Sequence, residues 1–148
     1  MRRLLRSRRH ASGQTLVEFA LIIPVFILMM VGVFDVGRAV YASSTINNAA
    51  HEAVRLAIVD QDVADVRGKA VSHAVGVGLA PTAVTIRWLN ADYADLAPCN
   101  ATPVDGCTVE VVIDYQFTAA TPIIGNLIGT INLQGLARQP IERGYTSP

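Results

Sequence analysis

A charge-free run of 16 residues, 19–34, constrains this chain more than any other feature. Glu18 and Asp35 flank the run, and apolar residues beyond them extend it to a membrane-length segment of about 15–41. A helix that crosses a bilayer needs about 20 largely apolar residues. A charged side chain at the centre of such a helix raises the free energy of membrane insertion by about 2.5–3.5 kcal/mol, so a charge at such a position indicates a functional role. The sequence therefore predicts a membrane helix with a functional carboxylate, Glu18, near its beginning.

The charge distribution is strongly asymmetric along the chain. Five arginines and no acids precede Gly13. The whole chain has 12 basic and 12 acidic residues, so the part after Gly13 carries a net charge of −5. The positive-inside rule then predicts a single-pass protein of the cytoplasmic membrane, with its N-terminus inside and its C-terminal part outside. A nucleic-acid-binding protein would instead spread its basic residues over a folded face, so we expect contact with membrane lipid and none with nucleic acid.

The apolar run has a second interpretation, as a secretory signal peptide. Residues 40–42, Val-Tyr-Ala, loosely fit a small-residue cleavage site. A cut near Ala42 would release a soluble secreted binding protein. However, Asp35 and Arg38 lie between the apolar run and this site, and a signal peptide leaves Glu18 unexplained. We favour a retained anchor and keep the secreted protein as the alternative.

The helix is expected to continue beyond the membrane segment, over residues 14–58. No Pro or Gly follows Gly37 in this range, and Pro24 is expected to kink the first half. At 1.5 Å per residue, this helix would be roughly 65 Å long. One face of its second half carries apolar residues at steps of three and four, namely Val36, Ala39, Val40, Ala50, Ala53, Val54 and Ala57.

The sequence of residues 59–148 predicts a small α+β domain. Asp60, Asp62 and Asp65 favour the start of a short helix, which Gly76 would end. Apolar and polar residues then alternate over 84–88, 108–117 and 130–134, as in strands with one buried face. The expected fold is an antiparallel sheet of three to four strands covered by helices. The apolar connection 118–129 is either a buried crossover or an exposed patch that packs on a neighbouring subunit or the membrane.

Two cysteines, Cys99 and Cys107, lie in a loop rich in turn-forming residues. In an exported segment we expect a disulfide between them, with two free thiols as the alternative. Their spacing does not fit a zinc knuckle, and His51 lacks the second histidine of a zinc-protease helix. The sequence contains no catalytic constellation, so no enzyme activity, metal or cofactor is expected.

The residues around Glu18 resemble a known processing signal. Residues 13–19, GQTLVEF, resemble the prepilin cleavage motif of type IV pilins: glycine, the cut, four residues, glutamate and an aromatic. The longer stretch from Gly13 to Ala57 resembles the TadE family, which comprises minor pilins or pseudopilins of the bacterial Tad/Flp tight-adherence pilus system. Its Pro24, its FDVGR sequence at 34–38 and its NAAHEAVR sequence at 48–55 carry the resemblance.

The resemblance implies a role for each residue of this motif. Residues 1–13 would be a basic leader, and a membrane prepilin peptidase would cut after Gly13. Gln14 would become the new N-terminus, and Phe19 is the aromatic of the motif. Glu18 would pair with an N-terminal ammonium and set the register of assembly. The implied protein is a non-enzymatic subunit for pilus assembly and surface adhesion, whose partners are other pilin subunits and the Tad inner-membrane machinery.

Overall fold

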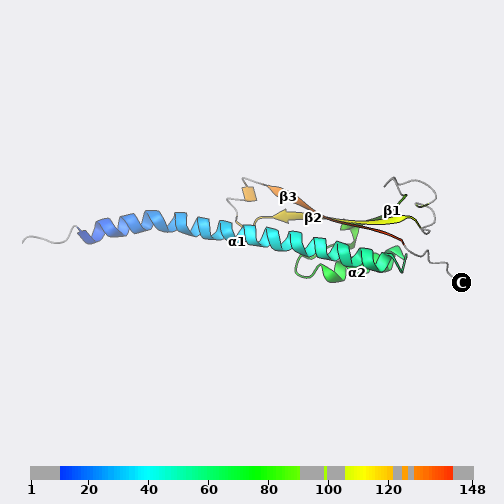
Figure 1. The fold of residues 1–148 in the computed structure, drawn as a ribbon. Helices are drawn as coiled ribbons and strands as arrows, with labels where there is room; N and C mark the ends of the chain where they lie inside the picture. The colour runs from blue at the N-terminus through cyan, green and yellow to red at the C-terminus, as the bar shows by residue number, and fades with distance from the viewer. Residues whose placement is uncertain (1–10, 91–98, 100–105, 122–124, 127–128, 142–148) are drawn as a thin grey trace, which may run out of the picture.

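The computed structural model describes residues 11–90, 99, 106–121, 125–126 and 129–141, with no side chains described for 11 and 12. A long helix, α1 (Ala11–Ala57), is followed by a short helix, α2 (Val63–His73), and a single 3-10 turn, η1 (Pro81–Ala83). Three strands complete the described fold: β1 (Val84–Leu89), β2 (Thr108–Thr118) and β3 (Thr130–Pro140). This arrangement confirms the predicted α+β fold (Figure 1).

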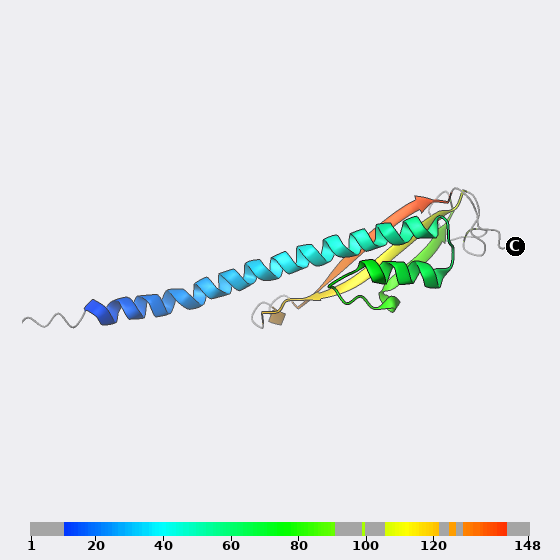
Figure 2. The ribbon, with the colours of Figure 1, turned by 90° about the horizontal axis from the view of Figure 1, so that it is seen from below.

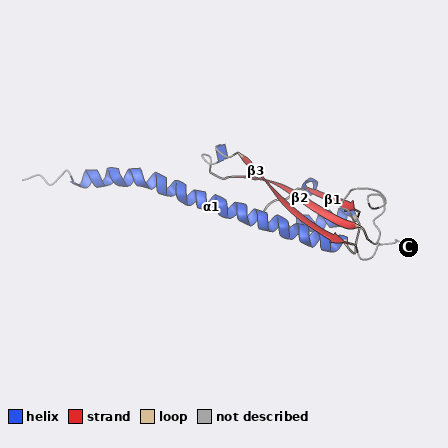
Figure 3. Cartoon of the chain, turned by 45° about the horizontal axis from the view of Figure 1, so that its top comes forward, coloured by secondary structure: helices blue, strands red, loops and turns tan. Residues whose placement is uncertain are grey.

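The first half of α1 projects away from the rest of the molecule (Figure 1). The helix stays continuous through Pro24 and curves gently in this half (Figure 3). Its most apolar 18-residue stretch is not buried at all, so this stretch is not part of the hydrophobic core of the described fold. By length and composition, α1 can cross a membrane.

The second half of α1 belongs to the hydrophobic core. Ile46, Ala49, Ala50 and Ala53 are completely buried there. The apolar face predicted from Val36 onward starts later than expected, because Val36 and Val40 are 63% and 61% exposed. The sheet and α2 cover only the second half of the helix (Figure 2), so apolar burial on α1 begins at Ala42.

The sheet is antiparallel, with β2 between β1 and β3. Both helices pack on one face of it: α1 contacts β2 and β3, and α2 contacts β1 (Figure 2). The residues of β2 predicted to face the helices do so, since Val109, Val111 and Ile113 are fully buried there. The opposite face does not follow the predicted alternation over its first half, because Thr108, Glu110 and Val112 are also buried. β3 continues to Pro140, six residues beyond the alternation that predicted it.

Helix α2 begins where the cluster of acidic residues predicted a helix start. The side chain of Asp62 caps the helix by accepting a hydrogen bond from the backbone N–H of Ala64 at 2.7 Å. Gly76 follows the helix with a φ of 83°, a conformation that favours glycine. The predicted short helix is therefore confirmed, although it ends at His73, three residues before Gly76.

Gly135 allows β3 to lie directly against α1. A Cβ atom at this position would come within 2.7 Å of the carbonyl oxygen of Ile46 and 2.8 Å of its carbonyl carbon. Both are backbone atoms of α1, so neither can rotate away as a side chain would. Glycine at position 135 therefore sets the distance between the helix and the sheet.

We expect Gly135→Ala to destabilise the protein by about 1–3 kcal/mol, the usual cost of forcing extra volume into a packed core. Thermal unfolding of the full chain in detergent micelles measures this. Gly68→Ala is the matched control, because Gly68 lies in α2 with nothing within 4 Å of its added Cβ. That control should be neutral or stabilising by up to about 1 kcal/mol. An unchanged melting temperature for Gly135→Ala would contradict the close packing.

Candidate functional site

The residues predicted to form the processing segment lie on the first turns of α1. Gln14 and Glu18 are one turn apart, and the side-chain Nε2 of Gln14 donates a hydrogen bond to Oε1 of Glu18 at 3.2 Å. Both side chains are exposed, and Phe19 is 60% exposed. The space around Gly13 is open, with no atom within 4 Å of an added Cβ. Within the described residues, this segment is therefore accessible to a partner.

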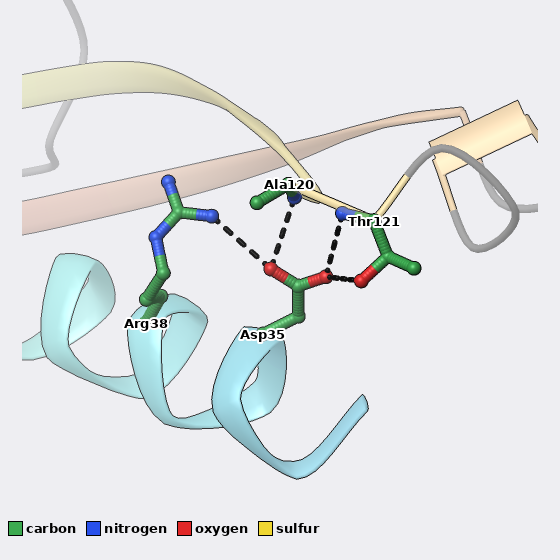
Figure 4. Close-up of polar contacts among 4 residues, drawn as sticks. All are labelled: Asp35, Arg38, Ala120 and Thr121. Atoms are coloured by element: carbon green, nitrogen blue, oxygen red, sulfur yellow. Dashed lines mark hydrogen bonds and ion pairs between the residues drawn. The ribbon is translucent and has the colours of Figure 1, made fainter. Parts of the chain in front are cut away.

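A second polar site, which we call the Asp35 clasp, joins α1 to the residues that follow β2 (Figure 4). It consists of Asp35, Arg38, Ala120 and Thr121. Oδ1 of Asp35 accepts hydrogen bonds from the backbone N–H of Ala120 at 2.9 Å and from Nη1 of Arg38 at 3.1 Å. Oδ2 accepts from the backbone N–H of Thr121 at 3.1 Å and from its hydroxyl at 2.6 Å. The clasp therefore uses both oxygens of one carboxylate.

The local structure explains why these groups meet. β2 ends at Thr118, so the N–H groups of Ala120 and Thr121 lie beyond the strand ladder and need another acceptor. Asp35 is only 4% exposed, and a buried carboxylate requires a cation or several donors. Arg38 supplies the cation from the next turn of α1, and its guanidinium lies 5.3 Å from the centre of the Phe117 ring. The clasp thus fixes the end of the β2–β3 hairpin to α1.

The sequence did not reveal this role of Asp35. In the sequence, Asp35 stands out only as a charge that interrupts the apolar run, because Arg38 is the only one of its clasp partners that is close to it in sequence. The other partners are 85 and 86 positions away. The i, i+3 spacing of the two charged residues was the only signal of a polar site.

An ion cluster around one buried carboxylate, that of Glu110, spans the outer face of the sheet. Glu110 of β2 pairs with Arg87 of β1 and Arg138 of β3, its direct neighbours in the antiparallel register. Nη2 of Arg87 lies 2.6 Å from Oε1 of Glu110, and Nε of Arg138 donates to Oε2. The alternation in β2 placed Glu110 on the polar face, yet its side chain is only 1% exposed because two arginines flank it.

Cys99 and Cys107 form a disulfide, with their Cα atoms 5.7 Å apart. Both residues are buried, and Cys107 directly precedes β2. Most of the loop between them lies outside the described residues, as do 122–124 and 127–128 of the apolar connection after β2. The described residues contain no group of three or more His, Cys, Asp or Glu side chains that would hold a metal ion.

One stretch of the sequence that matches a known family includes residues of both polar sites on α1. Residues 13–55 match the model of the TadE-like protein family. This match confirms the resemblance found in the sequence. The TadE-like segment, as we call residues 13–55, begins at Gly13 and includes Asp35 and Arg38. No curated protein and no solved structure matches the chain.

The TadE-like segment covers the membrane-length half of α1 and most of the half that packs in the core. It excludes α2 and the whole sheet. Asp35 therefore lies in the matched segment while two of its clasp partners, Ala120 and Thr121, lie outside it.

Proposed function

We propose that this protein is a non-enzymatic minor pilin or pseudopilin-type subunit that serves Tad/Flp pilus assembly and surface adhesion. The observation that carries the proposal is the match to the TadE-like family, which begins at Gly13, the residue before the proposed cut. Residues 1–13 are then a basic leader, 14–58 the membrane-anchored helix and 59–148 an extracytoplasmic domain. Its proposed partners are the prepilin peptidase, other pilin or pseudopilin subunits, the Tad inner-membrane machinery and membrane lipid.

The proposed cut changes the surroundings of Glu18. Before cleavage, the amide of Gln14 donates to the Glu18 carboxylate from one turn away. After cleavage, the same residue also carries the new N-terminal ammonium. An ionised group inside a bilayer is stabilised by pairing, so this ammonium, or that of a neighbouring subunit, is the natural partner of Glu18. Pairing at this position would set the register in which subunits pack.

The disulfide and the charge asymmetry support the proposed orientation. Disulfides persist in oxidising compartments and are rare in the bacterial cytoplasm, so Cys99 and Cys107 favour a C-terminal domain outside the cell membrane. The arginines before Gly13 favour an N-terminus that stays inside. Both observations support a single-pass protein with its folded part outside.

The alternative, a secreted protein released near Ala42, fits the fold less well. Such a cut would separate Asp35 from the domain to which it is fixed by three hydrogen bonds. It would also fall inside a continuous helix, at a residue that is only 3% exposed. The products would lose both the clasp and part of the helix that leads into the core.

We expect the mature protein to begin at Gln14, because the cut removes all residues up to Gly13. Intact-mass measurement and N-terminal sequencing of the protein purified from its native membrane test this directly. A mature chain that begins near Ser43 would contradict the pilin-type proposal and would support the secreted alternative. An uncut chain in cells that contain an active prepilin peptidase would also contradict it.

A further inference from the structure

An apolar cavity lies between α1 and the end of the β2–β3 hairpin, beside the Asp35 clasp. Its volume is about 310 Å³. Asp35 borders it, but the carboxylate is already bonded within the clasp. The apolar walls come from α1 and from the two strands that face it, mainly through Gly32, Val36, Ala39, Phe117, Ala119 and Ile131. The cavity therefore offers hydrocarbon contacts and almost no free polar group.

The cavity lies at the level where the apolar surface of α1 ends. Phe34, Val36, Val40 and Tyr41 are between 56% and 64% exposed, so this surface continues past Asp35 for two turns. Tyrosine is enriched where membrane helices meet water. Tyr41 lies at the end of this surface, and its hydroxyl donates a hydrogen bond to the backbone carbonyl of Val75 at 3.2 Å, which joins this level of α1 to the folded domain. A bilayer that covers the exposed surface of α1 up to Tyr41 brings its outer leaflet to the cavity.

Thr121 also borders a cavity along the more deeply apolar part of α1. A second cavity of about 390 Å³ is bounded by Thr121 of the clasp and by five residues of α1 between positions 23 and 31. Thr121 therefore lies next to the part of α1 that is proposed to be inside the bilayer. This position of Thr121 places it close to the lipid surface.

The size of the first cavity limits what can fill it. An α-helix with its side chains is about 10–12 Å across, so a helix of a second copy cannot enter a space of about 310 Å³. An apolar cavity of about half this volume binds benzene, so the space suits a single hydrocarbon chain. Left empty, the lining would lose the dispersion contacts that a hydrocarbon occupant provides.

A cationic group is available for the polar end of such a ligand. The side chain of Arg38 is 42% exposed, although one of its nitrogens is bonded to Asp35. Its guanidinium lies over Phe117, which also lines the cavity. Arginine N–H groups bind phosphate oxygens strongly, so Arg38 is placed to meet a phospholipid headgroup.

From these observations we propose that the cavity binds one acyl chain of an outer-leaflet phospholipid, whose phosphate contacts Arg38. The inference rests on the proposed membrane location of α1. The bound chain fills the space between the helix and the hairpin end, and so attaches the folded domain to the bilayer surface at a second point.

The test is photolabelling of the full chain in vesicles of phosphatidylethanolamine and phosphatidylglycerol. A fraction of the phosphatidylglycerol carries a diazirine at the end of one acyl chain, and fragmentation mass spectrometry maps the labelled residues. We expect label on the apolar half of α1 and also on Phe117 or Ile131. Two substitutions fill the cavity: Ala39→Leu from the helix side and Ala119→Leu from the side of the strands. Each should lower the labelling of Phe117 and Ile131 about tenfold.

Val40→Leu is the matched control, because Val40 is next to Ala39 but is 61% exposed. It should leave the labelling unchanged.

Label on residues 19–34 with none on Phe117 and Ile131 overturns the lipid site while leaving the membrane location intact. Equal labelling of Phe117 and Ile131 in the two cavity-filling variants, if their melting temperatures show that they fold, also overturns it. If a second copy covers this surface instead, these two residues stay unlabelled and Phe117→Cys yields cross-linked dimers. Absence of label from the whole of α1 would contradict the membrane location itself.

Discussion

Gly13→Val is expected to abolish removal of the leader and to leave the full-length chain in the membrane. The proposed peptidase must bring its catalytic groups close to the backbone at the cut, and a β-branched side chain there obstructs that approach. Nothing in the described structure packs within 4 Å of an added Cβ at Gly13, so the substitution does not disturb the fold. The leader arginines remain, so membrane insertion should be normal. Intact-mass measurement of the membrane fraction would show one uncut species.

Gly37→Val is the matched control for this experiment. Gly37 lies in the same helix, and an added Cβ there also has no neighbour within 4 Å. Its processing should match that of the unchanged protein, which separates an effect at the cut from a general effect of valine in α1. Normal cleavage of Gly13→Val would refute the assignment of Gly13.

Glu18→Ala tests the step after cleavage in the same strains. The variant should lose its leader normally, because the residues at the cut are unchanged, but it should fail to support piliation. Electron microscopy and the yield of sheared pili measure this. Normal piliation would show that pairing of Glu18 does not set the register.

Asp35→Ala is expected to detach the end of the β2–β3 hairpin from α1. The substitution removes three hydrogen bonds that Ala120 and Thr121 donate to the Asp35 carboxylate. A hydrogen bond to a charged group contributes about 1.5–3 kcal/mol, so we expect a local loss of about 3 kcal/mol. Hydrogen exchange at the Ala120 and Thr121 amides should then accelerate about 100-fold.

The rest of the protein should respond much less to this change. The core between α1 and β2 lies several turns from Asp35 and does not depend on the clasp. Asp65→Ala serves as the control, since Asp65 is an exposed acidic residue in the first turn of α2. Unchanged exchange at Ala120 and Thr121 in Asp35→Ala would show that the clasp does not hold the hairpin end.

Features that depend on local sequence were predictable. The long helix follows from a long stretch of apolar residues and alanines, which Pro24 and the glycines do not interrupt, and α2 follows from the acidic residues before Val63. The alternation in β2 predicted which of its residues face the helices, because successive side chains of a strand point to opposite faces. The pattern around Gly13 and Glu18 predicted the TadE-like match.

Features that depend on contacts between distant residues were not predictable from the sequence. Asp35 has backbone N–H partners whose positions follow from where β2 ends, not from their residue types. Glu110 is buried because the strand register places one arginine on either side of it, and the sequence does not specify that register. Val36 has the spacing of a core residue, yet it lies beyond the end of the apolar cover provided by the sheet and α2.

The contact between Ile46 and Gly135 also has a consequence for the order of events during biosynthesis. Of the described elements, it joins the first to be synthesised, α1, to the last, β3, so the core cannot close until β3 has been synthesised. Until that moment Glu110 lacks Arg138, and one face of α1 remains uncovered. A chain that stops before β3 is therefore left partly open, in a form that quality-control proteases can cut. Completion of β3, rather than formation of the early helices, determines when the described fold becomes stable.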